Sequence, residues 1–418
     1  MLGKAAGKLC VHAGRNFTMS TEAGATKGQL LNRLAGWYRV SAILLLNTIL
    51  FFVVVNVLSH VVLTIREKHF QVAPPSDIYP EDSFAAVYPE FDRPEWNAML
   101  KENWSRPYVF GGYLLFKEAR FEGKYVNVSE AGFRKVGHQG PWPPVSTNFN
   151  VFVFGGSTMF GYGVADDQTF ASYLQEAMGR YSAKRLCVYN FGAGYYYSTQ
   201  ERIFFERLLT HVQKPDIAMF VDGLNDLWHA GDEASFADKL AAAFDREPKP
   251  LPLEKLPVMQ ILRKLERKTF AAKVVPAAPA DVPGQVQAIL DCYRRNVRLI
   301  EAACREFGVT PVFVWQPIPS YKYDTQHHLF YRSPDSYQHQ IHGYPEMARI
   351  YKEGALGSHF LWCADLQEAE KECLYVDNHH YTARFAKKLA EQVCLMCAER
   401  GLLKAAGLES KPVPFPKP

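Results

Sequence analysis

The sequence predicts an α/β fold in which one central parallel sheet lies between two layers of helices. Two observations carry this prediction: strand-like and helix-like stretches alternate after about residue 146, and distinctive residues follow the strands. Strands joined through helices pair in parallel, and the helices then cover both faces of the sheet. Five buried strands are expected, at residues 148–156, 185–192, 216–223, 310–317 and 360–366.

Amphipathic stretches between and after these strands predict the covering helices. They lie at residues 170–182, 200–212, 285–308 and 382–403. Residues 229–285 interrupt the alternation with charged residues, Pro and Ala, so we expect an insertion or a flap there. No internal repeat is evident.

An apolar segment near the N-terminus predicts a membrane anchor. Residues 40–65 contain no charged side chain, and about 20 apolar residues suffice to cross a bilayer. A cleaved signal peptide is the alternative, but the apolar run is too long, begins late and lacks a small-x-small cleavage site. We therefore expect a retained transmembrane helix that acts as a signal-anchor.

The charges that flank this segment predict its orientation. Lys and Arg are concentrated in residues 1–39, whereas few follow residue 65. The positive-inside rule places residues 1–39 in the cytoplasm and the rest of the chain outside. In a bacterium, this is a single-pass protein of the inner membrane with its bulk in the periplasm.

The segment between the anchor and the first strand is predicted to be irregular. It is rich in Pro, Tyr and Trp, and residues 125–134 suggest short strands and turns. We expect a stalk near residues 72–80 and a collar packed beside the main domain. The predicted segments are a cytoplasmic tail (1–39), a transmembrane helix (40–65), a stalk and collar (66–145), the sheet domain (146–402) and a C-terminal tail (403–418).

Composition excludes two classes of function. The chain has a net charge of only +4 and no dense Lys/Arg stripe, so no nucleic-acid partner is expected. No His/Cys cluster has the spacing of zinc ligands, so neither a metal nor a cofactor is expected. Aromatic residues make up 14% of the chain, which would suit a surface that handles sugars or acyl chains, although structural aromatics are the simpler explanation.

The cysteines give weaker predictions. Seven of the eight follow the predicted anchor, so at least one exported thiol is unpaired. Cys363 and Cys373 flank a short polar segment and are the best candidates for a disulfide. Cys394 and Cys397 lie three residues apart in a helical pattern, which is typical of packed core thiols.

The residues that follow the strands predict a functional site, because open α/β sheets bind ligands beyond the carboxyl ends of their strands. The first strand runs into two glycines and Ser157, the second is followed by Gly194, and the third by Asn225. Asp377 and His380 precede the last helix. Turn chemistry or helix capping explains each of these alone, but the ordered set indicates a common site.

This ordered set resembles the SGNH (GDSL-type) hydrolase superfamily, whose four blocks follow the same order across a flavodoxin-like sheet. The resemblance covers about residues 120–400. The block I serine matches Ser157, the block III asparagine matches Asn225, and the Asp-x-x-His pair matches Asp377 and His380. The sequence is most similar to a membrane-anchored bacterial branch with GGST in block I, a YYYS-type block II and a Gln-Pro pair after the fourth strand.

The sequence also departs from the family pattern. Block I reads GGST in place of GDS, so the carboxylate before the serine is missing. In block II the usual spacing from Asn190 to the donor glycine falls on Tyr195. Gly194 and Tyr195 therefore both remain candidates, since the donor would be a backbone N–H, although only glycine tolerates every φ. The helix after Asp-x-x-His lacks the Pro and Gly that are common there in the family. This departure bears on the helix cap more than on the catalytic residues.

The resemblance implies acyl transfer through a serine. A serine hydroxyl becomes a good nucleophile when a neighbouring base takes its proton. His380 would be that base, and Asp377 would fix its tautomer and stabilise the imidazolium. The negative charge on the tetrahedral intermediate would be bound by the Ser157 N–H, the N–H in the Gly194 region and the Asn225 amide.

Further residues are candidates for secondary roles. His379 is an alternative base that ranks below His380. Tyr195 and Gln316 are candidate substrate contacts, with loop anchoring as the alternative for Gln316. The insertion at 229–285 and the aromatic, His-rich stretch at 321–344 could each act as a lid or a specificity loop.

The function expected first is an exported, membrane-anchored serine esterase that removes O-acetyl groups from a cell-envelope or extracellular glycan. An O-acetyltransferase with the same residues is the alternative, and it would need a multi-span membrane partner, because a single helix cannot carry acetyl groups across a bilayer. A lipase, a thioesterase or a non-catalytic glycan-binding scaffold is less favoured. The expected partners are an acylated glycan or another ester, and the lipid bilayer through residues 40–65.

Overall fold

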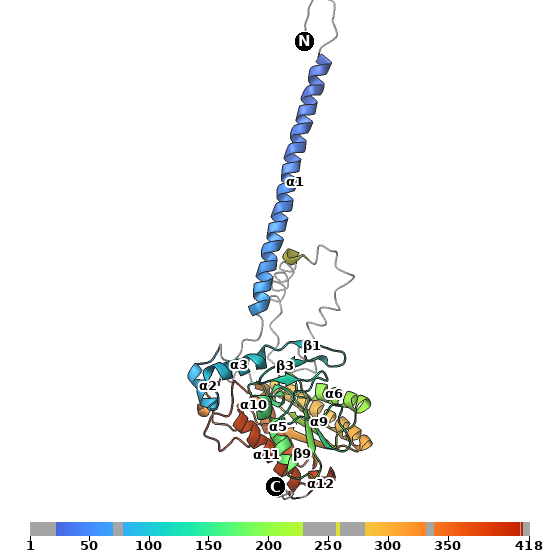
Figure 1. Cartoon of the computed structure of the whole chain (residues 1–418), viewed down its shortest axis with the longest axis vertical. Helices are drawn as coiled ribbons and strands as arrows, with labels where there is room; N and C mark the ends of the chain where they lie inside the picture. Colours follow the sequence, from blue (N-terminus) through green and yellow to red (C-terminus); the bar gives the residue numbers. More distant parts are fainter. Residues whose placement is uncertain are drawn as a thin grey trace, which may run out of the picture. The chain divides into compact units, whose positions relative to one another are not determined.

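The computed structural model describes residues 22–69, 78–228, 256–259, 281–331, 338–409 and 411–412. The chain divides into two compact units, residues 1–66 with 250–273, and residues 67–249 with 274–418. The first unit contains most of helix α1 (Glu22–His69), drawn in Figure 1 as one continuous helix. The second contains the sheet. Most of the predicted insertion at 229–285 lies outside the described residues.

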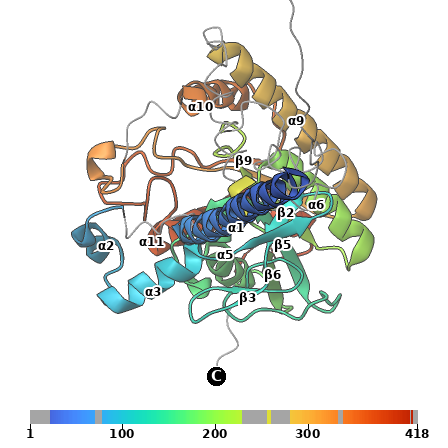
Figure 2. The same cartoon turned by 90° about the horizontal axis from the view of Figure 1, so that it is seen from above.

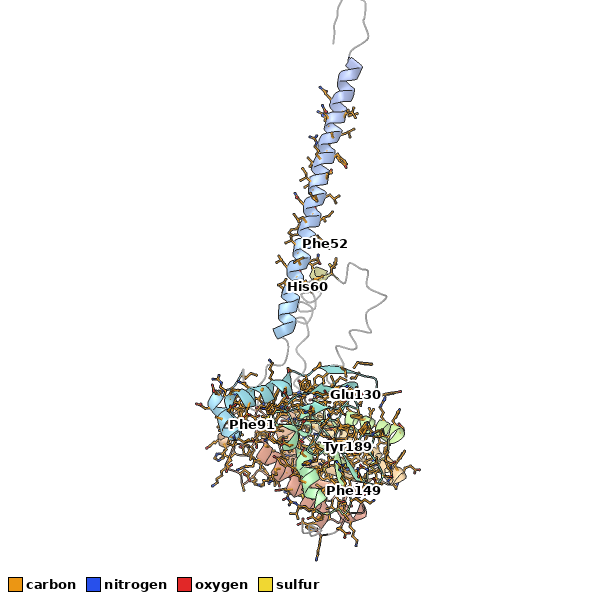
Figure 3. All side chains as sticks on the ribbon, in the orientation of Figure 1. Phe52, His60, Phe91, Glu130, Phe149 and Tyr189 are labelled. Carbon is orange, nitrogen blue, oxygen red and sulfur yellow. The ribbon has the colours of Figure 1, made fainter. Side chains whose placement is uncertain are left out.

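Helix α1 contains the candidate membrane span. Its stretch Gly28–Val62 is long and apolar enough to cross a membrane, and it includes most of the predicted segment 40–65. These 35 residues rise about 52 Å along the helix axis, more than the hydrocarbon core of a bilayer. Thr48 and Asn56 each donate a side-chain hydrogen bond to a carbonyl one turn earlier in the helix. The side chains of α1, including Phe52, stand out from its axis in Figure 3.

The second unit is built on a five-stranded parallel sheet, which confirms the predicted fold class. Its strands are β5 (Phe149–Gly155), β6 (Leu186–Asn190), β7 (Ile217–Asp222), β8 (Thr310–Trp315) and β9 (Phe360–Trp362). The order across the sheet is β6-β5-β7-β8-β9, and every neighbouring pair is parallel. This is the doubly wound order of flavodoxin-like folds. Each of the five predicted strands is present.

The two faces of the sheet carry different side chains because a strand alternates its side chains between faces. Along β5, Phe152 and Phe154 join one core cluster, whereas Val151 and Val153 join the other. The phenylalanine face is covered by α6 (Ser198–His211), α9 (Val282–Phe307) and α10 (Gln338–Lys352). The valine face is covered by α5 (Phe170–Gly179), α11 (Ala383–Glu399) and α12 (Leu402–Ala405). Figure 2 shows α9 and α10 together at one side of this unit.

Two segments differ from the sequence prediction by being packed. Helix α10 begins inside the stretch 321–344 and continues beyond it, and Phe330 and Tyr344 of that stretch are fully buried. Part of the stretch 321–344 therefore packs into the core. In the predicted C-terminal tail, Leu403 and Leu408 are buried, so the packed structure extends beyond residue 402.

The described part of the collar, residues 78–145, contains helices that the sequence analysis did not predict. Its elements are α2 (Glu81–Val87), α3 (Arg93–Trp104), the hairpin β1 (Tyr108–Gly111) with β2 (Leu115–Glu118), and β3 (Phe121–Glu122) with β4 (Asn127–Val128). Helix α3 begins with a capping box, in which the Asp92 carboxylate accepts from the Glu95 N–H at 2.9 Å and Glu95 accepts from the Asp92 N–H. This Asp-x-x-Glu signal was present in the sequence.

Arg134 connects the collar to the sheet domain. Its side chain is fully buried and pairs with Asp166 at 2.9 Å. It also donates to the carbonyls of Gly161 (2.6 Å) and Val164 (2.7 Å), and its backbone N–H donates to Asn190 O at the end of β6. A buried cation with this many acceptors holds the loop after α4 (Ser157–Phe160) in place. The sheet domain also contains the short helical turns η2 (Asp166–Gln168) and η4 (Thr325–His327).

The predicted disulfide between Cys363 and Cys373 is wrong. Both are free thiols. Cys363 packs under the valine face with its Sγ 3.9 Å from Met396 Sδ, whereas Cys373 packs against the collar core and donates to Tyr375 O at 3.3 Å. The two cysteines flank the same segment but enter different clusters, so closeness in sequence did not bring the sulfurs together. Cys394 and Cys397 are buried free thiols, as predicted.

Candidate active site

Ser157 lies at the carboxyl end of β5, where it starts the short helix α4. The glycine before it is required by close packing. A Cβ on Gly156 would lie 2.2 Å from Asn225 Nδ2 and 3.2 Å from Tyr196 O. Only glycine lets the Asn225 amide approach the backbone beside Ser157. The two glycines that end the strand thus bring the turns after β5 and β7 together.

Three predicted residues form a chain of hydrogen bonds. His380 Nε2 lies 2.8 Å from Ser157 Oγ, and His380 Nδ1 lies 2.6 Å from Asp377 Oδ2. The second carboxylate oxygen of Asp377 accepts from the backbone N–H groups of His379 (2.9 Å) and His380 (2.8 Å). Because a carboxylate only accepts, the imidazole proton lies on Nδ1, which leaves Nε2 to accept from the Ser157 hydroxyl.

Electrostatics separate the two neighbouring histidines. Burial opposes ionisation of Asp377, but the attraction and hydrogen bonds of His380, with a smaller contribution from His379, hold its pKa well below its usual range. Asp377 is therefore a carboxylate at neutral pH. Desolvation and repulsion by His380 lower the pKa of His379 to about 4. His379 is neutral at pH 7, and the histidine that is hydrogen-bonded to Ser157 Oγ is His380.

Two aromatic rings hold the His380 ring, and one comes from the collar. Tyr162 stacks on it with the centroids 5.3 Å apart and the planes 21° apart. Trp104, the last residue of α3, meets it edge-on at 5.8 Å and 84°. Such contacts restrict the orientation of the imidazole. Neither residue was a candidate from sequence; Tyr162 at least follows Ser157 closely, whereas nothing local marks Trp104.

The donors beside Ser157 have distinct environments. Ser157 is the first residue of α4, so its N–H has no acceptor within the helix. The Asn225 side-chain amide carries two N–H groups, and one of them bonds Tyr196 O at 2.7 Å.

The two block II candidates differ in backbone geometry. The Gly194 N–H donates to Glu118 Oε1 at 3.3 Å. Tyr195 has a φ of +66°, in the left-handed region that normally favours glycine. Tyr195 stands where the spacing from Asn190 places the block II donor, and its backbone takes a conformation that glycine adopts most easily. The geometry favours Tyr195 over Gly194 as the donor.

Gln316 lies inside the site rather than at its surface. Its side chain is buried, and its Oε1 accepts from Thr158 Oγ1 at 2.7 Å and from Tyr381 OH at 3.0 Å. These bonds favour the alternative that Gln316 anchors loops around Ser157. Tyr195, by contrast, is 39% exposed and remains a candidate substrate contact, whereas its neighbour Tyr196 is buried.

The carboxylates nearest to the turn after β7 do not form a metal site. Burial, reinforced by neighbouring carboxylates, raises the pKa of Glu201 and of Asp222 well above their usual values, so both tend to hold a proton. Asp226 accepts from the Ser198 hydroxyl at 2.6 Å and ties the start of α6 to this turn. Within the described ranges, no group of three or more His, Cys, Asp or Glu side chains could hold a metal ion.

Residues 153–344 match the sequence model of the GDSL-like lipase/acylhydrolase family. The matched segment contains Ser157, Tyr195 and Asn225. It ends before Asp377 and His380, which complete the hydrogen-bond chain in three dimensions. Among curated proteins, none matches the chain.

Solved structures similar to this chain include three esterases. The acetyl xylan esterase AlAXEase is 13% identical, with a TM-score of 0.34, over 58% of this chain and 96% of that chain. Axe2, an acetylxylan esterase from Geobacillus stearothermophilus, is 14% identical, with a TM-score of 0.33, over 64% and 98%. AlinE4, an SGNH-hydrolase family esterase, is 16% identical, with a TM-score of 0.28, over 61% and 98%.

Proposed function

We propose that the protein is a serine esterase that works through an acyl-enzyme on Ser157. The observation that carries this proposal is the continuous hydrogen-bond chain from Ser157 through His380 to Asp377, with separations of 2.8 and 2.6 Å. His380 Nε2 takes the hydroxyl proton as Ser157 Oγ attacks the ester carbonyl, and then gives that proton to the departing alcohol. Water, activated by the same nitrogen, hydrolyses the acyl-serine. Asp377 stabilises the imidazolium in both half-reactions.

We propose that three donors bind the oxyanion: the N–H groups of Ser157 and Tyr195 and the side-chain amide of Asn225. The argument for Ser157 is its place at the start of α4, and for Tyr195 its glycine-like backbone next to the Gly194 turn. For Asn225 it is the contact with Gly156, one residue before the nucleophile. An amide suits this position because it donates without bringing a charge.

The proposed location is the outer face of a bacterial inner membrane. Its support is the apolar stretch of α1 and the concentration of Lys and Arg in residues 1–39, which favours a cytoplasmic N-terminus. On this basis the sheet domain works outside the cytoplasm, and helix α1 anchors it in the bilayer.

The proposed substrate is an O-acetylated glycan of the cell envelope. Aromatic rings form a connected series that begins beside His380. Trp104 contacts Tyr162, whose hydroxyl lies 2.8 Å from that of Tyr108. Tyr108 in turn contacts the exposed ring of Tyr195. Half-exposed aromatic faces next to a nucleophile suit sugar rings, which offer C–H groups to π-systems as well as hydroxyls for hydrogen bonds.

The test uses the purified full-length chain in detergent. We expect Ser157 to be labelled by a fluorophosphonate and p-nitrophenyl acetate and acetylated oligosaccharides to be hydrolysed. Both signals should vanish in Ser157→Ala and persist in Ser182→Ala, which changes a surface turn. Faster cleavage of p-nitrophenyl palmitate than of acetyl esters would contradict the substrate class. Labelling with little hydrolysis, but with transfer to sugar hydroxyls, would indicate the acetyltransferase that depends on a multi-span partner.

Replacing Asn225 by alanine is expected to lower kcat by about 10²- to 10³-fold, the usual loss for one oxyanion donor, with little change in KM. The remaining N–H groups would still bind the oxyanion, so activity should not vanish. Steady-state kinetics on p-nitrophenyl acetate measure this effect, with Asn148→Ala as the control at the opposite end of β5. A large rise in KM at unchanged kcat would show that Asn225 binds the ground state instead.

A further inference from the structure

The collar hairpin β1–β2 is hydrogen-bonded to the segment that carries one proposed oxyanion donor, the Tyr195 N–H. Three contacts join them: Glu118 Oε1 accepts from the Gly194 N–H (3.3 Å), Phe116 O accepts from Tyr196 OH (2.5 Å), and Leu114 O accepts from Gln200 Nε2 (3.0 Å). Two of these contacts fall on the residues directly before and after Tyr195. One hairpin therefore contacts both residues that flank Tyr195.

Glu118 is the ionisable group in this contact. Its side chain is 1% exposed. Oxygen Oε1 also accepts from Tyr162 OH at 3.3 Å, and Tyr162 is the ring that stacks on His380. Oxygen Oε2 faces the guanidinium of Arg106 at 3.5 Å. One buried carboxylate therefore touches the loop of the proposed oxyanion donor and the ring that supports the proposed base.

The packing around Gly194 is tight. A Cβ on Gly194 would lie 2.0 Å from Tyr108 OH and 3.1 Å from Tyr162 OH. A left-handed tyrosine backbone is strained and persists only where its surroundings hold it. The N–H that bonds Glu118 belongs to Gly194, the residue directly before this strained tyrosine.

We infer that Glu118 is a positioning residue for the reaction: its carboxylate fixes the Gly194 amide so that the Tyr195 N–H points at the oxyanion. This role rests on the proposed function, because it requires an oxyanion at Ser157. Glu118 itself does not touch the substrate. It acts from outside the matched domain segment, since it lies on the collar, before residue 153.

The alternative is a buried ion pair that only stabilises the fold, and two substitutions separate the two roles. Glu118→Gln keeps an acceptor oxygen at the place of Oε1 but removes the charge opposite Arg106. Glu118→Asp keeps the charge but shortens the side chain by one methylene, which withdraws both oxygens from Gly194. Breaking a buried ion pair destabilises a protein strongly, so Glu118→Gln should have the lower Tm.

The experiment measures kcat, KM, the fluorophosphonate labelling rate and Tm of the full-length variants in detergent. If Glu118 is a positioning residue, the order of the two variants in stability is the reverse of their order in activity. Glu118→Asp should be the more stable variant, yet its kcat and labelling rate should fall roughly 10- to 100-fold, which is less than for the loss of a whole oxyanion donor. Glu118→Gln should stay within about threefold of the wild-type kcat per folded molecule, with KM little changed in both. Glu130→Gln, an exposed carboxylate on the same collar, should match the wild type.

Activity that follows stability, with Glu118→Asp active and Glu118→Gln impaired, would overturn the positioning role and leave a purely structural ion pair. If Glu118→Gln does not fold, Glu118→Asp decides alone, because wild-type kcat in that variant would contradict the inference. Failure of the wild type to label at Ser157 would instead overturn the proposed function and the role of Glu118 with it.

Discussion

Replacing His380 by alanine is expected to lower kcat by about 10⁶-fold, since a nucleophile and its base act as one unit. Removing the ring removes the base, because His380 Nε2 is the atom that lies 2.8 Å from Ser157 Oγ. The double variant Ser157→Ala/His380→Ala should be no slower than either single variant. Turnover of p-nitrophenyl acetate, corrected for the uncatalysed rate, measures all three.

His379→Ala is the matched control for this prediction. His379 is adjacent in sequence and its ring packs 4.3 Å from that of His380, so the substitution disturbs the same region. Its pKa near 4 keeps it neutral at pH 7 and it does not bond Ser157 Oγ, so we expect a loss of no more than about tenfold. The reverse result, an inactive His379→Ala beside an active His380→Ala, would show that the base has been assigned to the wrong histidine.

Replacing Asp377 by asparagine is expected to lower kcat by about 10⁴-fold while the backbone geometry is kept. The asparagine amide can donate to His380 Nδ1, which places the imidazole proton on Nε2 and prevents that atom from accepting the Ser157 proton. Its carbonyl oxygen can still accept the N–H groups of His379 and His380. Asp291→Asn, on the exposed side of α9, is the control for removing one negative charge. Near-normal kcat in Asp377→Asn would contradict the role of the carboxylate.

The same substitution should remove part of the pH dependence of stability. The pKa of Asp377 is lower in the folded protein than in the unfolded chain, because the contacts with His380 and His379 outweigh burial. Its contribution to the free energy of unfolding is therefore present above the unfolded pKa of about 4 and is lost as the pH falls toward the folded pKa. Thermal unfolding between pH 7 and pH 3 should show a smaller loss of Tm in Asp377→Asn than in the wild type.

The sequence predicted the sheet because its signals are local. Each of the five strands is a short buried run. The side chains along β5 point alternately into the two core clusters, one on each face of the sheet. The residues that follow the strands were equally visible, and parallel strands bring their carboxyl ends to one edge. For this reason the sequence alone predicts a common neighbourhood for Ser157, Asn225, Asp377 and His380.

Other predictions failed where a local signal was missed or misleading. The Asp-x-x-Glu capping box of α3 was present in the sequence, but the surrounding Pro and aromatic residues suggested an irregular collar. Cys363 and Cys373 are close in sequence, yet the chain between them leads one into the core beneath the sheet and the other toward the collar. Gln316 is a different case: it stands at a strand end as expected, and the bonds of Thr158 and Tyr381 to its side-chain oxygen favour the loop-anchoring alternative.

By itself, the sequence determined the fold class, the apolar helix and the residues of the Ser157–His380–Asp377 chain. Only the tertiary structure decided what holds these residues in place: Trp104 against His380, Glu118 against Gly194, and the left-handed backbone that distinguishes Tyr195 from Gly194. The physical reason is that periodicity and turn chemistry act between residues a few positions apart. Trp104 and His380, or Glu118 and Gly194, meet only after the collar has packed on the sheet domain, and no local pattern records that contact.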